Sequence, residues 1–419
     1  MTFTLPPALR LSDAQVADQI SEYKYLHQNP ELSHKEYKTA DYLQEQLNSL
    51  ALGAGVERAV HRVGQTGVVL VLTHGEGPVV GYRADTDGLP IKEASGRDYA
   101  SVATTDVEGS TVPLMHGCGH DTHMAVALAA ARLFAANPEH WSGTLVFVFQ
   151  PAEEVGTGAQ TMLDDGLWNI APRPQVMFAQ HVFPLEVGTF LVSAGEFLAA
   201  SDSLDVTVYG RGGHGSQPET TIDPIVLGAA MITRLQTIVA REVAPLESAV
   251  VTVGMFQGGT KNNIIPDSAR FTLNIRTFTE GTRRRVLDAV DRILKGEAYA
   301  AGAPEPLVEA QPSFPATVND AQTTARVQSV LVDVFGEEHV ATDDTARLMG
   351  SEDFSLLATS LGVPYTFWGF GGYDLAQFKN PEEIPGNHSP FFAPDPEITL
   401  EAGTHAAVAV LLDALMPRN

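Results

Sequence analysis

The feature that most constrains the fold is a series of short apolar runs, rich in β-branched and aromatic residues, that alternate with helix-like segments. Four runs lie at residues 68–72, 79–82, 145–149 and 176–179. Their nearly continuous hydrophobicity is typical of strands that are covered on both faces. Residues 124–136, between the second and third runs, are helical in composition and apolar on most sides. This alternation predicts an α/β fold with a central sheet wrapped by helices.

A helix is also expected near the start of the chain. Ser33 and Glu36 have the spacing of a capping box, in which each side chain accepts a hydrogen bond from a backbone amide at the helix start. The apolar residues that follow recur at helical intervals. They are Tyr37, Ala40, Leu43, Leu47 and Leu50.

A different pattern of apolar and polar residues occupies the middle of the chain. Residues 204–209 alternate like a half-buried strand, and Asp223 with Pro224 supplies an N-cap and a first-turn proline for a helix. Two strands follow, at residues 249–256 and 270–278. A second helix is expected at about residues 282–301, and a last short strand ends near residue 309. The order βαββαβ predicts a ferredoxin-like α+β unit with one solvated sheet face.

The domain organisation follows from these two patterns. The chain has 419 residues, which is long for a single core and favours two domains. The α/β pattern resumes after the insert and includes a strand at residues 364–370. We therefore predict a discontinuous catalytic domain, residues 1–197 and 311–419, interrupted by a smaller domain at 198–310.

Ionisable side chains follow the predicted strands. In open α/β sheets, ligands bind beyond the carboxyl ends of the strands, so side chains placed there are expected to meet at one edge. The types present are thiolate, imidazole and carboxylate, which are the usual metal ligands. The candidates are Asp85, Cys118, His120, Glu153, Glu154 and His181.

Cys118 and His120 form the most informative pair. They are two residues apart and flanked by glycines, in an eight-residue segment that holds three histidines and Asp121. The alternative is a buried cysteine beside loop histidines, because a lone cysteine is usually a small buried hydrophobe. The density of ligand types favours a metal site, and the sulfur suits zinc.

The other candidates are weaker when taken singly. Glu153 and Glu154 could be two solvated charges, but after an apolar strand one can ligate a metal while the other accepts a proton from water. His181 could equally be a core histidine, and His388 is a loop histidine that could complete the ligand set. Asp85 either caps a turn or orients a ligating imidazole.

His214 lies in a glycine-rich turn, residues 210–216, inside the predicted insert. The turn is not a phosphate-binding loop, because no Gly-Lys-Ser/Thr follows and the cation precedes the glycines. The histidine is either part of a plain surface turn or an exposed group that reaches a neighbouring site.

Charge and leader patterns exclude several classes of partner. Asp and Glu number 51 against 26 Lys and Arg, a formal net charge of −25, which disfavours nucleic acid and anionic membranes. The first residues lack the basic and apolar segments of a signal peptide. One cysteine allows no intrachain disulfide, which fits a reducing compartment. We expect a cytoplasmic protein that acts on a small molecule.

With these residues assembled, the sequence resembles the family of hippurate hydrolases, auxin-conjugate hydrolases and N-acyl-amino-acid amidohydrolases. The resemblance spans almost the whole chain and implies a metal-dependent exopeptidase-like catalytic domain with an inserted lid or dimerisation domain. The motifs that carry it, in order, are HQNPEL, RADTDGLP, HGCGHDTH, QPAEE, QHVFP, GRGGHGSQP, GGTKNNIIPD, GSEDF and NHSP.

The resemblance also implies roles for single residues. Two divalent metal ions, with Zn²⁺ expected before Mn²⁺ or Co²⁺, would be held by Cys118 as a bridge and by His120, Glu154, His181 and His388. Glu153 would be the general base that acts on a metal-activated water. His214 from the partner subunit of a homodimer would donate to the reacting carbonyl oxygen, and Asn263 and Arg276 would hold the substrate.

The activity expected is hydrolysis of the amide bond of an N-acyl amino acid. A dipeptidase or carboxypeptidase of the same mechanism is the main alternative. A thiol hydrolase with Cys118 as nucleophile is less favoured, because His120 is badly placed as a base for a residue two positions away. A non-catalytic metal-stabilised binding protein is the third alternative, but structural sites are normally closed.

Overall fold

The computed structural model describes residues 3–342 and 347–416. The chain forms two compact units. Unit 1 comprises residues 1–195, 318–346 and 353–419, and unit 2 comprises residues 196–317 and 347–352. The predicted insert, 198–310, lies within unit 2; the short segment 347–352, which the sequence pattern placed with the catalytic part, also belongs there. Its role as a lid or dimerisation domain stays a prediction.

Unit 1 is built on an eight-stranded mixed sheet in the order β1-β2-β6-β3-β7-β18-β8-β17. The central strands β6, β3, β7 and β18 are parallel to one another. Strand β2 runs antiparallel to β6, and β1 runs antiparallel to β2. The strands of unit 1 are β1 (Glu57–Val63), β2 (Gly67–His74), β3 (Val79–Asp85), β4 (Thr104–Val107), β5 (Ser110–Pro113), β6 (Gly143–Gln150), β7 (Val176–Glu186), β8 (Phe190–Leu191), β17 (Val340–Ala341) and β18 (Tyr365–Tyr373). The α/β prediction is confirmed.

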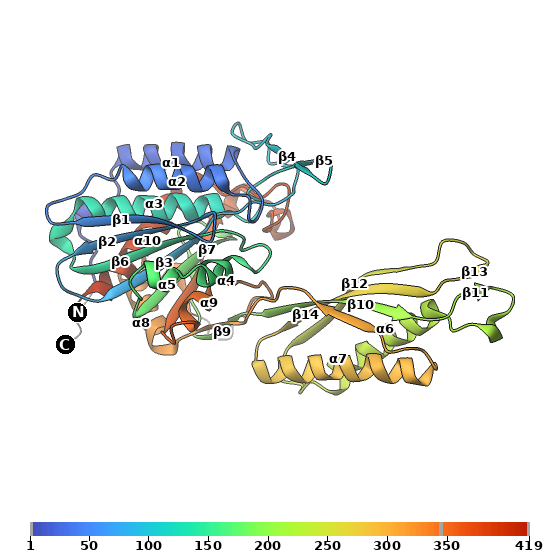
Figure 1. The fold of residues 1–419 in the computed structure, drawn as a ribbon. Helices are drawn as coiled ribbons and strands as arrows, with labels where there is room; N and C mark the ends of the chain where they lie inside the picture. The colour runs from blue at the N-terminus through green and yellow to red at the C-terminus, as the bar shows by residue number, and fades with distance from the viewer. Residues whose placement is uncertain (1–2, 343–346, 417–419) are drawn as a thin grey trace. The chain divides into compact units, whose positions relative to one another are not determined.

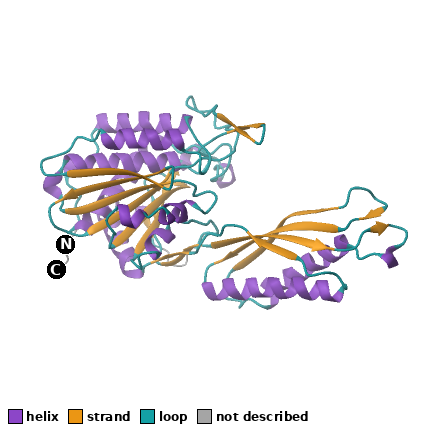
Figure 2. Ribbon diagram, viewed as in Figure 1, coloured by secondary structure: helices purple, strands orange, loops and turns teal. Residues whose placement is uncertain are grey.

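Helices cover this sheet (Figures 1 and 2). They are α1 (Asp13–Gln28), α2 (Tyr37–Asn48), α3 (His120–Ala136), α4 (Gly158–Asp164), α5 (Leu167–Ile170), α8 (Ala321–Phe335), α9 (Ser355–Thr359) and α10 (Pro396–Leu415). Helices α3 and α10 pack on each other and on the central strands, and α1 packs outside them. Their apolar side chains form one buried core with the sheet.

Helix α10 is long and apolar enough to cross a membrane by length and composition. In the structure, 78% of its apolar window is buried, and it lies against α3, α8 and β18. Hydrophobicity on all sides is what a helix surrounded by a core requires. Its composition is therefore explained by its place in unit 1.

The capping box predicted at Ser33 and Glu36 is wrong. Helix α2 begins at Tyr37 without a side-chain cap. The Ser33 hydroxyl instead donates to Asp87 Oδ2 at 2.6 Å, and the Glu36 carboxylate accepts from the amide of Ala152 at 2.9 Å. Both side chains take partners far along the chain, which outcompete the local cap.

Unit 2 has a four-stranded antiparallel sheet in the order β12-β14-β10-β15. Its elements are β10 (Ala200–Tyr209), β11 (Gly213–His214), α6 (Pro224–Arg241), β12 (Ala249–Gly258), β13 (Ile264–Ile265), β14 (Ser268–Thr277), α7 (Glu280–Ala300) and β15 (Leu307–Ala310); β9 (Gly195–Leu198) and β16 (Thr317–Asn319) lie where the chain passes between the units. Asp223 caps α6 through the amides of Ile225 and Val226, as predicted. Helices α6 and α7 share one apolar core with one face of the sheet, which is the expected ferredoxin-like arrangement.

Candidate metal centre

The ligand candidates of unit 1 meet at the carboxyl ends of the central strands. Strand β3 ends at Asp85, the turn after β6 carries Glu153 and Glu154, and His181 lies in β7. Cys118 precedes α3, whose first residue is His120. The sequence pattern started this helix at residue 124, so the structure moves its start to His120.

The five proposed ligands form one cluster. Cys118 Sγ lies 3.4 Å from His181 Nε2, and His388 Nε2 lies 3.3 Å from Glu154 Oε2. Ligand atoms of Cys118, His120 and Glu154 all lie within 4.8 Å of one another. Glu153 stands beside them, with Oε2 3.9 Å from His120 Nε2. The structure thus brings all five donors and the proposed base together.

Hydrogen bonds fix which ring nitrogen faces the cluster in the two buried ligand candidates His120 and His181. Nδ1 of His181 donates to its neighbour's carbonyl, Val182 O, at 2.8 Å, and Nδ1 of His120 donates to Asp87 O at 2.9 Å. Since a carbonyl can only accept, each Nδ1 carries a proton, which leaves Nε2 as the nitrogen that a metal can take. Nε2 of His120 is buried without a hydrogen-bond partner among the described residues, as is Glu154 Oε1.

The electrostatics of the cluster favour a bound cation. Burial raises the pKa of the Cys118 thiol well above its usual value, and the carboxylates of Glu154 and Glu153 raise it further. Burial lowers the pKa of His120, but Asp85 and Asp87 outweigh it and raise this pKa to about 10. Divalent ions stabilise a thiolate and compensate buried carboxylates. The unpartnered donors and the negative surroundings therefore fit divalent metal ions.

The loop that carries His388 is anchored to the rest of the cluster. The amide of His388 donates to Gly117 O at 2.7 Å, and Asn387 Nδ2 reaches Cys118 O at 3.1 Å and Val182 O at 3.2 Å. His388 has a φ of 66°, in the left-handed region. Such a conformation persists only where the surroundings hold it, and it clusters at functional sites.

Two residues that the sequence reading did not single out shape the centre. Oδ1 of Asp87 lies 3.2 Å from Nδ1 of His120. The Asp87 carboxylate also accepts hydrogen bonds from the backbone amides of Glu153 and Glu154, at 3.2 and 3.0 Å. His123 contacts Asp85 Oδ1 through Nδ1 at 2.5 Å. Both lie in quoted motifs, RADTDGLP and HGCGHDTH, but sequence spacing does not show which partner each one finds.

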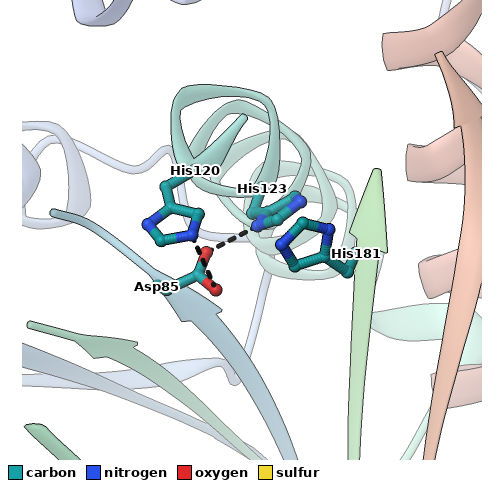
Figure 3. Close-up of side chains that lie close together, drawn as sticks. All are labelled: Asp85, His120, His123 and His181. Atoms are coloured by element: carbon teal, nitrogen blue, oxygen red, sulfur yellow. Dashed lines mark hydrogen bonds and ion pairs between the residues drawn. The ribbon is translucent and has the colours of Figure 1, made fainter. Parts of the chain in front are cut away.

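Figure 3 shows how Asp85 lies between His120 and His123, with His181 close by. The amide of Val182 donates to His123 Nε2 at 2.9 Å, so the His123 proton sits on Nδ1 and is donated to Asp85. Both nitrogens of His123 are therefore taken, and it is not a ligand. Oδ2 of Asp85 accepts from Arg83 at 2.8 Å and lies 3.6 Å from His120 Nε2. Asp85 therefore hydrogen-bonds His123, which is not a ligand, and only faces His120. Its role in orienting a ligating imidazole stays a prediction.

Comparison with known proteins decides the family. A model of peptidase family M20/M25/M40 matches residues 81–412, which is most of the chain. The chain belongs to peptidase family M20/M25/M40. The resemblance drawn from the motifs is thereby confirmed.

Relatives of this M20 chain cover nearly its full length. It is 33% identical over 397 residues to thermostable carboxypeptidase 2 of Saccharolobus solfataricus, a match that covers 92% of this chain and 93% of that one. It is 36% identical over 344 residues to the hippurate hydrolase of Campylobacter jejuni, with 82% and 85% covered. The solved structure of the Bacillus subtilis YXEP protein, a dinuclear metal binding M20 peptidase, is 28% identical with a TM-score of 0.74 and covers 97% of this chain and 100% of that one.

Family and geometry together make the chain a metal-dependent amidohydrolase with a dinuclear metal site. The thiol hydrolase and the non-catalytic binding protein are therefore excluded as alternatives.

The substrate-binding candidates of unit 2 fall into two places. His214 is exposed on β11 and pairs with β13, and the carbonyl of Asn263 accepts from the amide of Gly215, so these two segments lie side by side. Arg276 is half-buried on β14, opposite Ser201, and donates to Asn274 Oδ1 at 2.9 Å. The structure therefore brings His214 and Asn263 together and leaves Arg276 at the other end of the β10–β14 ladder.

Proposed function

We propose that this enzyme hydrolyses the amide bond of N-acyl amino acids, releasing a carboxylic acid and a free amino acid. The observation that supports it best is the pairing of two adjacent glutamates at the metal cluster, one among the ligands and one beside them. The hippurate hydrolase named above is a relative whose name describes an N-acyl amino acid as substrate.

In this proposal Cys118, His120, Glu154, His181 and His388 hold the two ions. Zn²⁺ is the metal we expect, because a thiolate and imidazoles suit it better than they suit Mn²⁺. When bound, the pair supplies Lewis acidity toward the amide carbonyl and makes water a better nucleophile near neutral pH.

Glu153 is the proposed general base. It takes the proton of the attacking water and passes it to the nitrogen of the leaving amino acid. Two features support the role. Glu153 is buried, and the Asp87 carboxylate accepts hydrogen bonds from the backbone amides of Glu153 and Glu154. The base and the ligand Glu154 therefore project in fixed directions. Precise placement of a base is worth as much as its pKa.

His214 is suited to donate to the carbonyl oxygen of a substrate. Its Nδ1 accepts from the amide of Ser216 at 3.1 Å, so the proton sits on Nε2. Since the side chain is exposed, Nε2–H is presented to solvent as a donor. A preorganised donor of this kind stabilises the charge that develops on the carbonyl oxygen.

The spacing inside unit 2 supports action across two subunits. The eight residue-to-residue steps along β14 from Ser268, near the His214 turn, to Arg276 span about 27 Å of extended strand. One amino-acid-sized substrate cannot contact His214 and Arg276 of the same unit. We therefore propose a homodimer in which His214 and Asn263 come from one subunit and Arg276 from the other.

A release assay tests the function. The metal-loaded enzyme is given N-benzoyl, N-acetyl and indole-3-acetyl amino acids, free dipeptides and N-blocked dipeptides, and metal content is measured on the same sample. Release of the amino acid mainly from N-acyl amino acids is expected. Preference for N-blocked dipeptides would favour the second candidate, a carboxypeptidase, which the 33% identity to the archaeal carboxypeptidase supports.

A further inference from the structure

Glu36 is a fully buried carboxylate whose bonds lead to the turn that carries the two catalytic-site glutamates. Its Oε1 accepts from the amide of Ala152 at 2.9 Å and from the amide of His34 at 3.0 Å. Its Oε2 accepts from the Thr66 hydroxyl at 2.8 Å. A buried carboxyl group this well bonded holds its three partners in place.

Both amides on Oε1 belong to strained residues. Ala152 has a φ of 51° and His34 a φ of 62°, in the left-handed region that residues with a Cβ rarely adopt. A residue in this region is strained and persists only when its surroundings over-determine its conformation. The Glu36 carboxylate provides that constraint for both.

The strained Ala152 sets the direction of the turn at the metal centre. Its carbonyl accepts from the amide of Gly158 at 3.1 Å, and a Cβ at Gly158 would lie 1.6 Å from the Pro151 carbonyl oxygen, so the turn is closed tightly. The amides of Glu153 and Glu154 then go to Asp87. Three successive amides are thus held by two buried carboxylates.

We propose that Glu36 is a positioning residue of the active site: by holding the left-handed Ala152, it fixes the directions in which Glu153 and Glu154 leave the turn. The inference rests on the proposed function in that Glu153 is taken as the base and Glu154 as a ligand. Glu36 itself touches neither substrate nor metal.

The test compares E36A with E36Q in the full-length enzyme. E36A removes the acceptor for Ala152, so Zn²⁺ affinity should fall about 10–100-fold and kcat about 10²-fold, with a smaller effect on KM. E36Q keeps an acceptor at Oε1 and can donate to Thr66, so both quantities should stay within a few-fold of wild type. Burial, with Asp87 nearby, raises the pKa of Glu36 to about 7, so a neutral amide matches it closely.

E31A is the matched control. The Glu31 carboxylate also accepts a hydrogen bond from a backbone amide in the same segment, that of Thr39 at 2.8 Å. This bond stabilises the first turn of α2 and not the turn at the metal centre. E31A should lose thermal stability yet keep kcat and Zn²⁺ affinity. If E36A does not fold, E36D takes its place, because a carboxylate one methylene shorter cannot reach Ala152 and should show the same losses relative to E36Q.

Faster hydrogen exchange of the Ala152 amide in E36A or E36D, with E36Q close to wild type, is the third expected result. Unchanged Zn²⁺ affinity and kcat in E36A, or E36D in its place, would overturn the proposal, as would equal losses in E36Q or in E31A. Zn²⁺ affinity and amide exchange need no substrate, so an error in the proposed substrate class would leave these two readouts unaffected.

Discussion

Cys118 illustrates at the residue scale how burial dictates chemistry. Burial, and then the surrounding carboxylates, raise the pKa of this thiol, so it remains neutral unless a cation is bound next to it. Such a group makes a poor nucleophile on its own and a good ligand once a metal is present. The same surroundings that argue against a thiol hydrolase therefore favour a metalloenzyme.

The first prediction concerns this sulfur. Cys118→Ser replaces a soft thiolate with a hydroxyl that binds Zn²⁺ weakly, so the purified variant should lose bound metal and turnover together. Metal content by elemental analysis and release of the amino acid are measured on one sample. A variant that keeps two equivalents of metal and near-normal turnover would remove Cys118 from the ligand set.

The second prediction concerns His27, a buried imidazole between two carboxylates. Its nitrogens lie 2.6 Å from Asp121 Oδ2 and 3.0 Å from Glu93 Oε1. Burial lowers its pKa, but the bonds to Asp121 and Glu93 outweigh burial and raise it to about 9. Because the folded value lies above the unfolded one, the stability it provides is complete below about pH 6.5 and is lost as pH rises through about 9.

Urea unfolding at pH 6.5 and pH 9 checks this expectation. The wild-type free energy of unfolding should fall over the interval, by up to about 3 kcal/mol from His27, while His27→Gln should lack that component. Parallel pH profiles for the two proteins would show that His27 does not carry the charge.

At the scale of elements, the start of α3 is the most demanding junction. Its N-cap, Gly119, has a φ of 88°, and a Cβ there would lie 2.4 Å from Val182 Cγ1. The helix start and strand β7 therefore approach more closely than any side chain allows. This approach brings Cys118 and His120 to His181.

Gly119→Ala should consequently destabilise unit 1 by about 2–4 kcal/mol, from the left-handed backbone together with the steric clash, and should weaken metal binding. Gly362→Ala is the control, since Gly362 also has positive φ, 67°, with no atom within 4 Å of a Cβ, so only the backbone term of about 1–2 kcal/mol applies. Similar losses of stability and metal in both variants would refute the close-approach argument.

Elements were predictable where the sequence pattern is repetitive. The apolar runs predicted β2, β3, β6, β7 and β18 because strands buried on both faces need continuous hydrophobicity, and Asp223 with Pro224 marked the start of α6. The failures involve partners distant in sequence: Ser33 binds Asp87, Glu36 binds Ala152, and His123 is bonded by Val182. Local spacing carries no information about such contacts, so the ligand types were foreseeable, whereas the contacts of Asp87 and His123 were not.

At the scale of the whole molecule, the proposed homodimer makes a prediction about mixed subunits. His214→Ala should fold and bind both metals but lose about 10²–10³-fold in turnover, as expected for removal of one donor to an oxyanion. Mixing it with Glu153→Gln should restore activity, because one site of each heterodimer combines an intact Glu153 with the partner's intact His214. If subunit exchange is demonstrated and no activity returns, His214 does not act across the dimer.

The central claim is that adjacent glutamates at one metal cluster have different tasks, Glu154 as ligand and Glu153 as base. Metal stoichiometry and turnover on the best N-acyl amino acid, measured in parallel for Glu153→Gln and Glu154→Ala, test it most directly. Glu153→Gln should retain both metals and lose about 10²–10⁴-fold in kcat, whereas Glu154→Ala should lose metal along with activity. The opposite pattern, metal lost in Glu153→Gln and kept in Glu154→Ala, would contradict the account.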